Sequence, residues 1–263
     1  MKTRKLILAV VSIITLSSII SCKKDMQNKV PIKKSSYQTT SRIALKETLL
    51  ENFNLAKVLH NGLLELEYSS IQDGLLTTKD TTGLFYLANN YFITQGNFST
   101  EEFTYLKNGI NGIIDTSNNL QQSLEAYFSN DTATKNIYTW IINQSENWTI
   151  SPSNFEQKMK NKLAEIDSNN TISNENKNAY SLILGASAGS YDYWKQNIEN
   201  WRQLLAPNTD TSICARKWVD FFLRDCAGAT WGTIYGSAIP LLGTTAGAIG
   251  GAAIISALEA QSW

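Results

Sequence analysis

The sequence predicts an all-α protein, with a multi-helix body followed by a C-terminal helical hairpin. Three observations support this fold class. Only four prolines occur in 263 residues, alternating polar and apolar residues of the strand type are scarce, and apolar residues recur at steps of three and four. Apolar residues make up 43% of the chain and aromatic residues 10%, which is enough to build a packed core.

The first 21 residues have the pattern of a secretory signal. Residues 1–5 contain Lys2, Arg4 and Lys5 and no acid. The 15 residues from 6 to 20 are apolar except for Ser and Thr, and this length is below the roughly 20 apolar residues that a membrane-spanning helix needs. We therefore expect residues 1–21 to direct export and to take no part in the fold.

The signal ends in Ile19-Ile20-Ser21-Cys22, which resembles the lipobox of bacterial lipoproteins. The resemblance implies cleavage before Cys22, a diacylglyceryl group on its sulfur and a fatty acyl group such as palmitate on its new amino group. A membrane is then the expected partner, because two or three acyl chains anchor a protein stably where one does not. An ordinary secretory signal followed by an unrelated cysteine is the alternative.

Residues 22–41 are polar, contain Pro31 and show no apolar periodicity, so we expect a flexible tether between the lipid and the body. Residues 21–25, Ser-Cys-Lys-Lys-Asp, resemble the start of exported Bacteroidetes lipoproteins. Lys23 in place of Asp after the lipidated cysteine implies the outer membrane, on its periplasmic or surface side.

The charge of the chain argues against nucleic acid as a partner. From Cys22 onward the chain has 20 basic and 23 acidic side chains, because the signal contains three of the 23 basic residues and none of the acids. The resulting charge of −3 includes no basic domain that would bind phosphates.

Residues 42–206 are expected to form the helical body. The first helix has one apolar face, which consists of Leu49, Phe53, Ala56, His60 and Leu63 or Leu64. Ser99 followed by Glu102 has the form of a capping box and precedes apolar residues at helical spacing. A second helix is therefore expected after Ser99.

Two more helices follow in the body. Ser151-Pro152 places a capping side chain before a proline at the first helical position, and Phe155 and Met159 continue the pattern. Residues 167–178 are rich in Asn and Ser and predict a turn. A long helix then carries an apolar and aromatic stripe, which we expect to face the core: Tyr180, Ile183, Leu184, Ser187, Tyr191, Trp194, Ile198, Trp201 and Leu205.

Residues 207–263 are expected to form a hairpin unit. Residues 226–258 are 33 consecutive positions without charge and contain seven of the fifteen glycines. Six of these glycines form two series spaced by four, Gly228, Gly232 and Gly236, and Gly243, Gly247 and Gly251. Spacing by four places glycine on one helix face, where another backbone can approach closely. The sequence therefore predicts a glycine-zipper hairpin with arms at 226–239 and 241–258, joined at Pro240.

This segment resembles the glycine-zipper tails of membrane-active bacteriocins. Together with the helix that contains His60-Asn61, it also resembles a set of uncharacterised Bacteroidetes secreted proteins. Arms of 14 and 18 residues would span about 21 and 27 Å as helices, against a hydrocarbon core near 30 Å. A hairpin packed within the protein and a hairpin that inserts into a membrane therefore both remain open.

The motifs that suggest chemistry do not form a catalytic site in the sequence. Residues 185–189 match the G-x-S-x-G nucleophile elbow around Ser187, but the single histidine, His60, precedes this serine, whereas the elbow requires a later one. We interpret Gly185 and Gly189 as positions of tight helix packing. We expect His60 to be a hydrogen-bonded core residue, because no second His or Cys lies near it in the sequence. No enzyme activity, cofactor or metal is predicted.

Cys214 and Cys226 remain after Cys22 is lipidated. Two cysteines in an oxidising compartment normally pair, but an unbroken helix would place these two about 18 Å apart. Either the helix breaks and a disulfide forms, or both thiols stay reduced. The expected function is that of a membrane-anchored lipoprotein with a structural or protein-binding role and an unknown protein partner. The alternative is a bacteriocin-like antagonist that perturbs membranes through the glycine-zipper tail.

Overall fold

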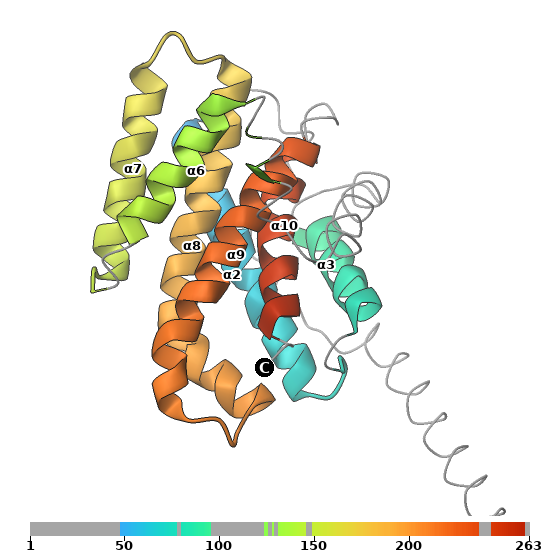
Figure 1. Ribbon diagram of the computed structural model, residues 1–263. Helices are drawn as coiled ribbons and strands as arrows, with labels where there is room; N and C mark the ends of the chain where they lie inside the picture. The colour runs from blue at the N-terminus through green and yellow to red at the C-terminus, as the bar shows by residue number, and fades with distance from the viewer. Residues whose placement is uncertain are drawn as a thin grey trace, which may run out of the picture.

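The computed structural model describes residues 48–77, 80–95, 124–125, 128, 131–145, 149–236 and 243–260. Within these residues the chain forms seven α-helices and no strand, so the predicted all-α class is confirmed (Figure 1). Cys22, the tether and the helix expected after Ser99 lie outside the described residues.

Helix α2, Leu49–Gln72, begins at a capping box. The Thr48 hydroxyl accepts a hydrogen bond from the backbone of Glu51, whose carboxylate accepts one from the Thr48 backbone at 2.6 Å. The predicted face is buried from Phe53 to Leu64. The helix ends before Gly74, which has a φ of 70° and so adopts the left-handed conformation that favours glycine.

Helices α3, Thr81–Gln95, and α6, Thr132–Ser145, were not anticipated from the sequence. Each begins after an aspartate that accepts a hydrogen bond from a backbone amide three residues later. Asp80 accepts from Gly83 at 2.8 Å, and Asp131 accepts from Thr134 at 3.0 Å. Local capping chemistry therefore fixes the start of both helices.

Helix α7, Pro152–Ser168, starts as predicted, since the Ser151 hydroxyl accepts from the amide of Asn154 at 3.2 Å and proline occupies the first turn. The turn expected over residues 167–178 is shorter in the structure and covers only residues 169–173. Its end is set by Ser173, which caps α8, Asn174–Leu205, through the amide of Asn176. The predicted stripe of α8 is buried except for the half-buried Leu205.

Helices α9, Thr211–Gly236, and α10, Gly243–Ala260, form the C-terminal hairpin. Helix α9 begins well before residue 226, where the first arm was expected, because residues 211–225 continue the same helix. The two helices run antiparallel, as the pairing of Gly228 with Gly251 and of Gly232 with Gly247 shows.

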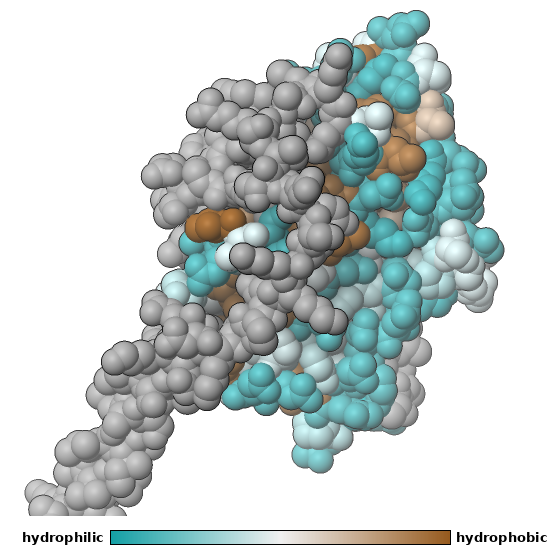
Figure 2. All heavy atoms as spheres, turned by 180° about the vertical axis from the view of Figure 1, so that it is seen from behind, coloured by the Kyte–Doolittle hydropathy of each residue, from teal (hydrophilic) through white to brown (hydrophobic). Residues whose placement is uncertain are grey.

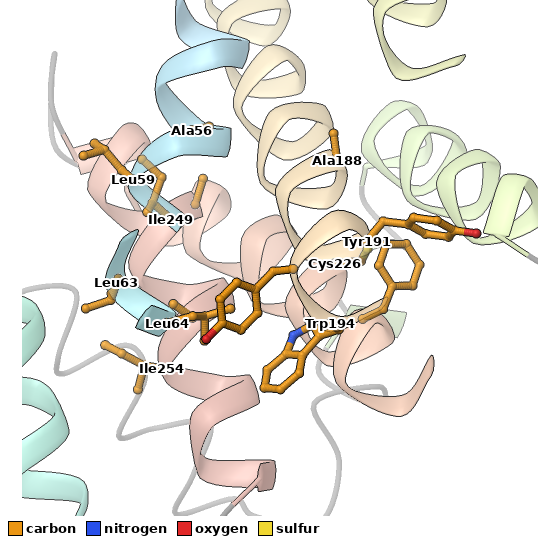
Figure 3. Close-up of a cluster of buried hydrophobic side chains, with 14 of the residues drawn as sticks. Ala56, Leu59, Leu63, Leu64, Ala188, Tyr191, Trp194, Cys226, Ile249 and Ile254 are labelled. Atoms are coloured by element: carbon orange, nitrogen blue, oxygen red, sulfur yellow. The ribbon is translucent and has the colours of Figure 1, made fainter. Parts of the chain in front are cut away.

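The hairpin belongs to the same core as the body. One cluster of buried apolar side chains includes residues from all seven helices, among them Phe53 of α2, Trp194 of α8, Phe221 of α9 and Ile254 of α10. Figure 3 shows side chains of α2, α8 and α10 converging in this cluster. The suggested boundary between residues 206 and 207 therefore does not coincide with a gap in the core.

Helix α10 is enclosed by four other helices. It lies against α2, α3, α8 and α9, and every residue from 247 to 257 is buried. On the face seen in Figure 2 most of the described surface is hydrophilic by contrast, with smaller apolar patches between. Among the helices of the described residues, none combines the length and the apolar character that crossing a membrane requires.

Candidate functional site

Asp225 of α9 is the centre of a buried polar cluster between α2, α8 and α9. Its Oδ2 accepts a hydrogen bond from the Ser190 hydroxyl at 2.6 Å and one from the Trp194 indole N–H at 2.7 Å. Both donors lie on α8, one turn apart, and all three side chains are 0% exposed. Two donors from one helix face stabilise a carboxylate that has lost its contact with water.

His60 of α2 is the third neighbour of Asp225. Its Nε2 lies 3.1 Å from Asp225 Oδ2, in a geometry that is not aligned as a hydrogen bond. Its Nδ1 lies 3.0 Å from the side-chain oxygen of Asn61. Asp225 therefore has polar contacts with both α2 and α8, and these contacts connect the hairpin to the body.

Glu67 is a second buried carboxyl group on the same face of α2. It follows His60 by seven residues, which is two helical turns. Both of its oxygens are buried and lack a hydrogen-bond partner within the described structure. Burial, and secondarily the nearby charge of Asp225, raises the pKa of Glu67 well above its ordinary value. The uncharged form of this side chain is therefore favoured in the folded protein.

Tyr193 and Cys226 flank the cluster. The Tyr193 hydroxyl accepts from Trp201 Nε1 at 3.1 Å and donates to the exposed Glu65 at 3.5 Å, and burial raises its pKa. The Cys226 thiol donates to the Ser187 hydroxyl at 3.3 Å. Burial raises the pKa of this thiol above its ordinary value, so it stays protonated and is a poor nucleophile.

The G-x-S-x-G residues lie inside helix α8, where a nucleophile elbow would need a turn between a strand and a helix. The Ser187 hydroxyl donates to the carbonyl of Ile183 at 2.8 Å. A methyl group at Gly185 would overlap the Phe53 carbonyl, and one at Gly189 would lie 2.8 Å from the side-chain oxygen of Asn61. Both glycines therefore allow α8 to approach α2 closely.

The glycines of the hairpin have the same effect between α9 and α10. A Cβ atom on Gly232 would overlap the carbonyl of Gly247, and one on Gly228 would overlap the carbonyl of Gly251. Likewise, a Cβ atom on Gly247 would overlap the carbonyl of Gly232, and one on Gly251 would overlap the carbonyl of Gly228. Of the other two glycines in the predicted series, Gly236 ends α9 and Gly243 begins α10.

The disulfide that the sequence left open is not formed. Cys226 is a thiol outside any disulfide. Helix α9 is continuous between Cys214 and Cys226, so the twelve residues of rise separate the two by about 18 Å. A disulfide needs α-carbons within about 7 Å. The alternative in which the helix breaks and a disulfide joins Cys214 to Cys226 is therefore wrong.

The sequence predicts His60 as a core residue but does not predict the acidic groups around it. The burial of Glu67 could have been predicted, because this residue lies three residues after Leu64 and four after Leu63 on the apolar face of α2. The position of Asp225 was harder to predict, since in the sequence it is only the last charged residue before an uncharged stretch. Only the tertiary fold, in which α2 and α9 both pack on α8, brings Asp225 to His60.

The cluster can hold helices together, but it offers no accessible nucleophile. His60, Glu67, Ser190 and Asp225 are all withdrawn from solvent. Within the described part of the chain, no three His, Cys, Asp or Glu side chains are arranged to hold a metal ion. Comparison of the chain with protein-family models, with curated proteins and with solved structures found no match.

Proposed function

We propose that the protein is an exported lipoprotein, anchored through lipid on Cys22, whose helical body has a structural or protein-binding role and no catalytic one. The observation that supports the anchor is the Ile19-Ile20-Ser21-Cys22 sequence after a basic and an apolar segment. The outer membrane is the proposed location. No nucleic acid, cofactor or metal is part of this proposal.

The burial of the polar cluster supports the non-catalytic role. The His, Asp and Ser side chains that resemble catalytic groups by type are 0% exposed, and Ser190 binds Asp225 where a nucleophile would have to bind His60. A general base activates a serine by accepting its proton. The contact between Ser190 and Asp225 therefore favours a structural role, in which the cluster joins helices, over a reaction with a substrate.

A protein-binding role is supported by aliphatic side chains on the surface. Leu50 and Val58 of α2 are 48% and 53% exposed, and Ile93 of α3 is 38% exposed. Helices α2 and α3 pack against each other, so these side chains lie on adjoining elements. Exposed aliphatic groups on adjoining elements offer area for burial against another protein.

The lipid anchor is tested by labelling producing cells with radioactive palmitate. We expect the label on the full-length protein to be lost in Cys22→Ala, because the thiol is the proposed site of the first lipid. Cys214→Ala is the matched control and should keep the label. Label retained by Cys22→Ala, or no label on the unmodified protein, would contradict the anchor.

A second candidate is a bacteriocin-like antagonist that perturbs membranes through the hairpin. The enclosure of α10 favours it, because a helix that is apolar on every side is stable either in the centre of a protein or in a lipid environment. The paired glycines would let α9 and α10 stay together during such a move.

Dye release from phospholipid vesicles separates the two candidates. For a structural or binding lipoprotein we expect vesicles to keep their dye when the purified full chain is added, because the glycine faces of α9 and α10 already pack on each other. Gly232→Leu, which opens that contact, is the comparison. Strong release by the unmodified protein would favour the antagonist and count against the first candidate.

A further inference from the structure

Helix α3 is a surface helix with one buried side and one exposed side. Its buried side includes Leu84 and Phe92, and the helix lies against α2 and α10 at an edge of the described helices (Figure 1). On the exposed side Tyr86 is 44% and Ile93 38% exposed. Asn90 lies between these two in the sequence and is half-buried. Steps of four and three residues place Tyr86, Asn90 and Ile93 on one face, which we call the outer face of α3.

The outer face of α3 belongs to a helix without charge. Of the seven described helices, α3 alone has no charged side chain, and the uncharged stretch extends from residue 81 to residue 100. By contrast, α2 exposes Glu51 and Glu65. The centres of protein interfaces are depleted of charge and rich in aromatic side chains, whereas a face for anionic lipid or nucleic acid would be basic. The outer face of α3 therefore favours a protein partner that is itself uncharged at the contact.

A second copy of the chain meets this requirement. In a two-fold dimer the same patch packs on itself, so a charged residue near the axis would oppose an identical charge. The outer face of α3 avoids that repulsion. If two α3 helices run antiparallel with the axis between residues 89 and 90, Tyr86 of each copy lies opposite Ile93 of the other. Asn90 then lies beside the axis, where its amide can both donate a hydrogen bond to the second copy and accept one from it.

We propose that the outer face of α3 is the surface on which two copies of the chain meet, with their α3 helices antiparallel. The proposal rests on the protein-binding role given above and names the partner. One helix face is smaller than the roughly 800 Å² per partner that a stable dimer buries. Copies held to one membrane by the proposed lipid anchor have a high effective concentration, so the contact forms there although free copies would separate.

Disulfide cross-linking of the full chain in producing cells tests this contact. Asn90→Cys is made in a Cys214→Ala background, because the Cys226 thiol is buried and Cys22 is the proposed lipid site. A disulfide needs α-carbons within about 7 Å, which only residues close to the axis satisfy. A mild oxidant should therefore give a band at twice the chain mass that a reductant removes. Asn161→Cys, exposed on α7, is the control and should stay monomeric.

Further changes, each added to Asn90→Cys, separate a specific contact from chance collision. Ile93→Glu places a charge within the apolar contact, and Tyr86→Ser removes the aromatic ring without adding charge. Each should abolish the dimer band. Ala164→Glu adds the same charge on the exposed side of α7 and should leave the band unchanged.

Palmitate labelling of the same samples distinguishes failure of the α3 contact from failure of the anchor. Lipidated protein without a dimer band, equal bands from Asn90→Cys and Asn161→Cys, or a band that survives both Ile93→Glu and Tyr86→Ser would overturn the contact. A cross-linked band at a mass other than twice that of the chain would assign the face to a different protein and overturn it too. Protein without palmitate would contradict the anchor; a dimer band from that protein would still support the α3 contact, and no band would overturn both.

Discussion

Asp225 has two hydrogen-bond donors, Ser190 and Trp194, and a close third neighbour in His60, and all four side chains are withdrawn from water. A neutral imidazole has one donor and one acceptor nitrogen. If Nε2 carries the proton that faces Asp225, Nδ1 must accept, and the Asn61 amide is then turned so that its NH₂ group points to the ring. Such an exchange of amide oxygen and nitrogen preserves the positions of the heavy atoms.

Replacement of Asp225 tests how much these contacts contribute. Asp225→Ala leaves a buried hydroxyl and a buried indole N–H without an acceptor, so we expect a loss of about 3–5 kcal/mol in the free energy of unfolding. Urea denaturation monitored by circular dichroism measures it. Asp220→Ala, exposed on the same helix, should lie within about 0.5 kcal/mol of the unmodified protein. Similar losses in both variants would show that the cluster adds nothing beyond helix α9 itself.

At the scale of elements, close helix pairs depend on glycine in two places. Gly185 and Gly189 bring α8 onto α2, and Gly232 with Gly247 brings α9 onto α10. In each case a new methyl group would meet a backbone carbonyl oxygen, and this oxygen cannot move unless its helix moves. Helix–helix distance in these pairs is therefore set by the backbones, and the usual gain from replacing glycine in a helix does not apply.

Gly232→Ala should destabilise the protein by about 1–3 kcal/mol through overpacking, although the same change in an unhindered helix stabilises by up to about 1 kcal/mol. Gly62→Ala is the matched control, because there the new methyl group meets the hydroxyl end of the Tyr91 side chain instead of a backbone carbonyl. Thermal unfolding of both variants measures the difference. An increase in melting temperature for Gly232→Ala would contradict the backbone contact.

At the scale of the whole molecule, the sequence predicts the parts that depend on local pattern. The all-α class, the buried face of α2, the Ser151 cap and the stripe of α8 follow from spacing and capping residues. Helix α3 was not predicted because its apolar residues lie on all sides of the helix, so no single apolar face stands out in the sequence. Phe85 and Phe92 are buried, whereas Tyr86 and Ile93 are exposed. The contact between His60 and Asp225 could not be predicted, because these residues are 165 positions apart in the sequence.

The enclosure of α10 also fixes the order in which the molecule can be completed. Helices α2, α3 and α8 all pack on α10, yet each is synthesised before it. Until residues 247–257 arrive, the surfaces that will receive them stay exposed to water, and the core is missing its central member. If the protein is exported, as we propose, a chain whose core is completed only by its last helix would reach the membrane before that core could close.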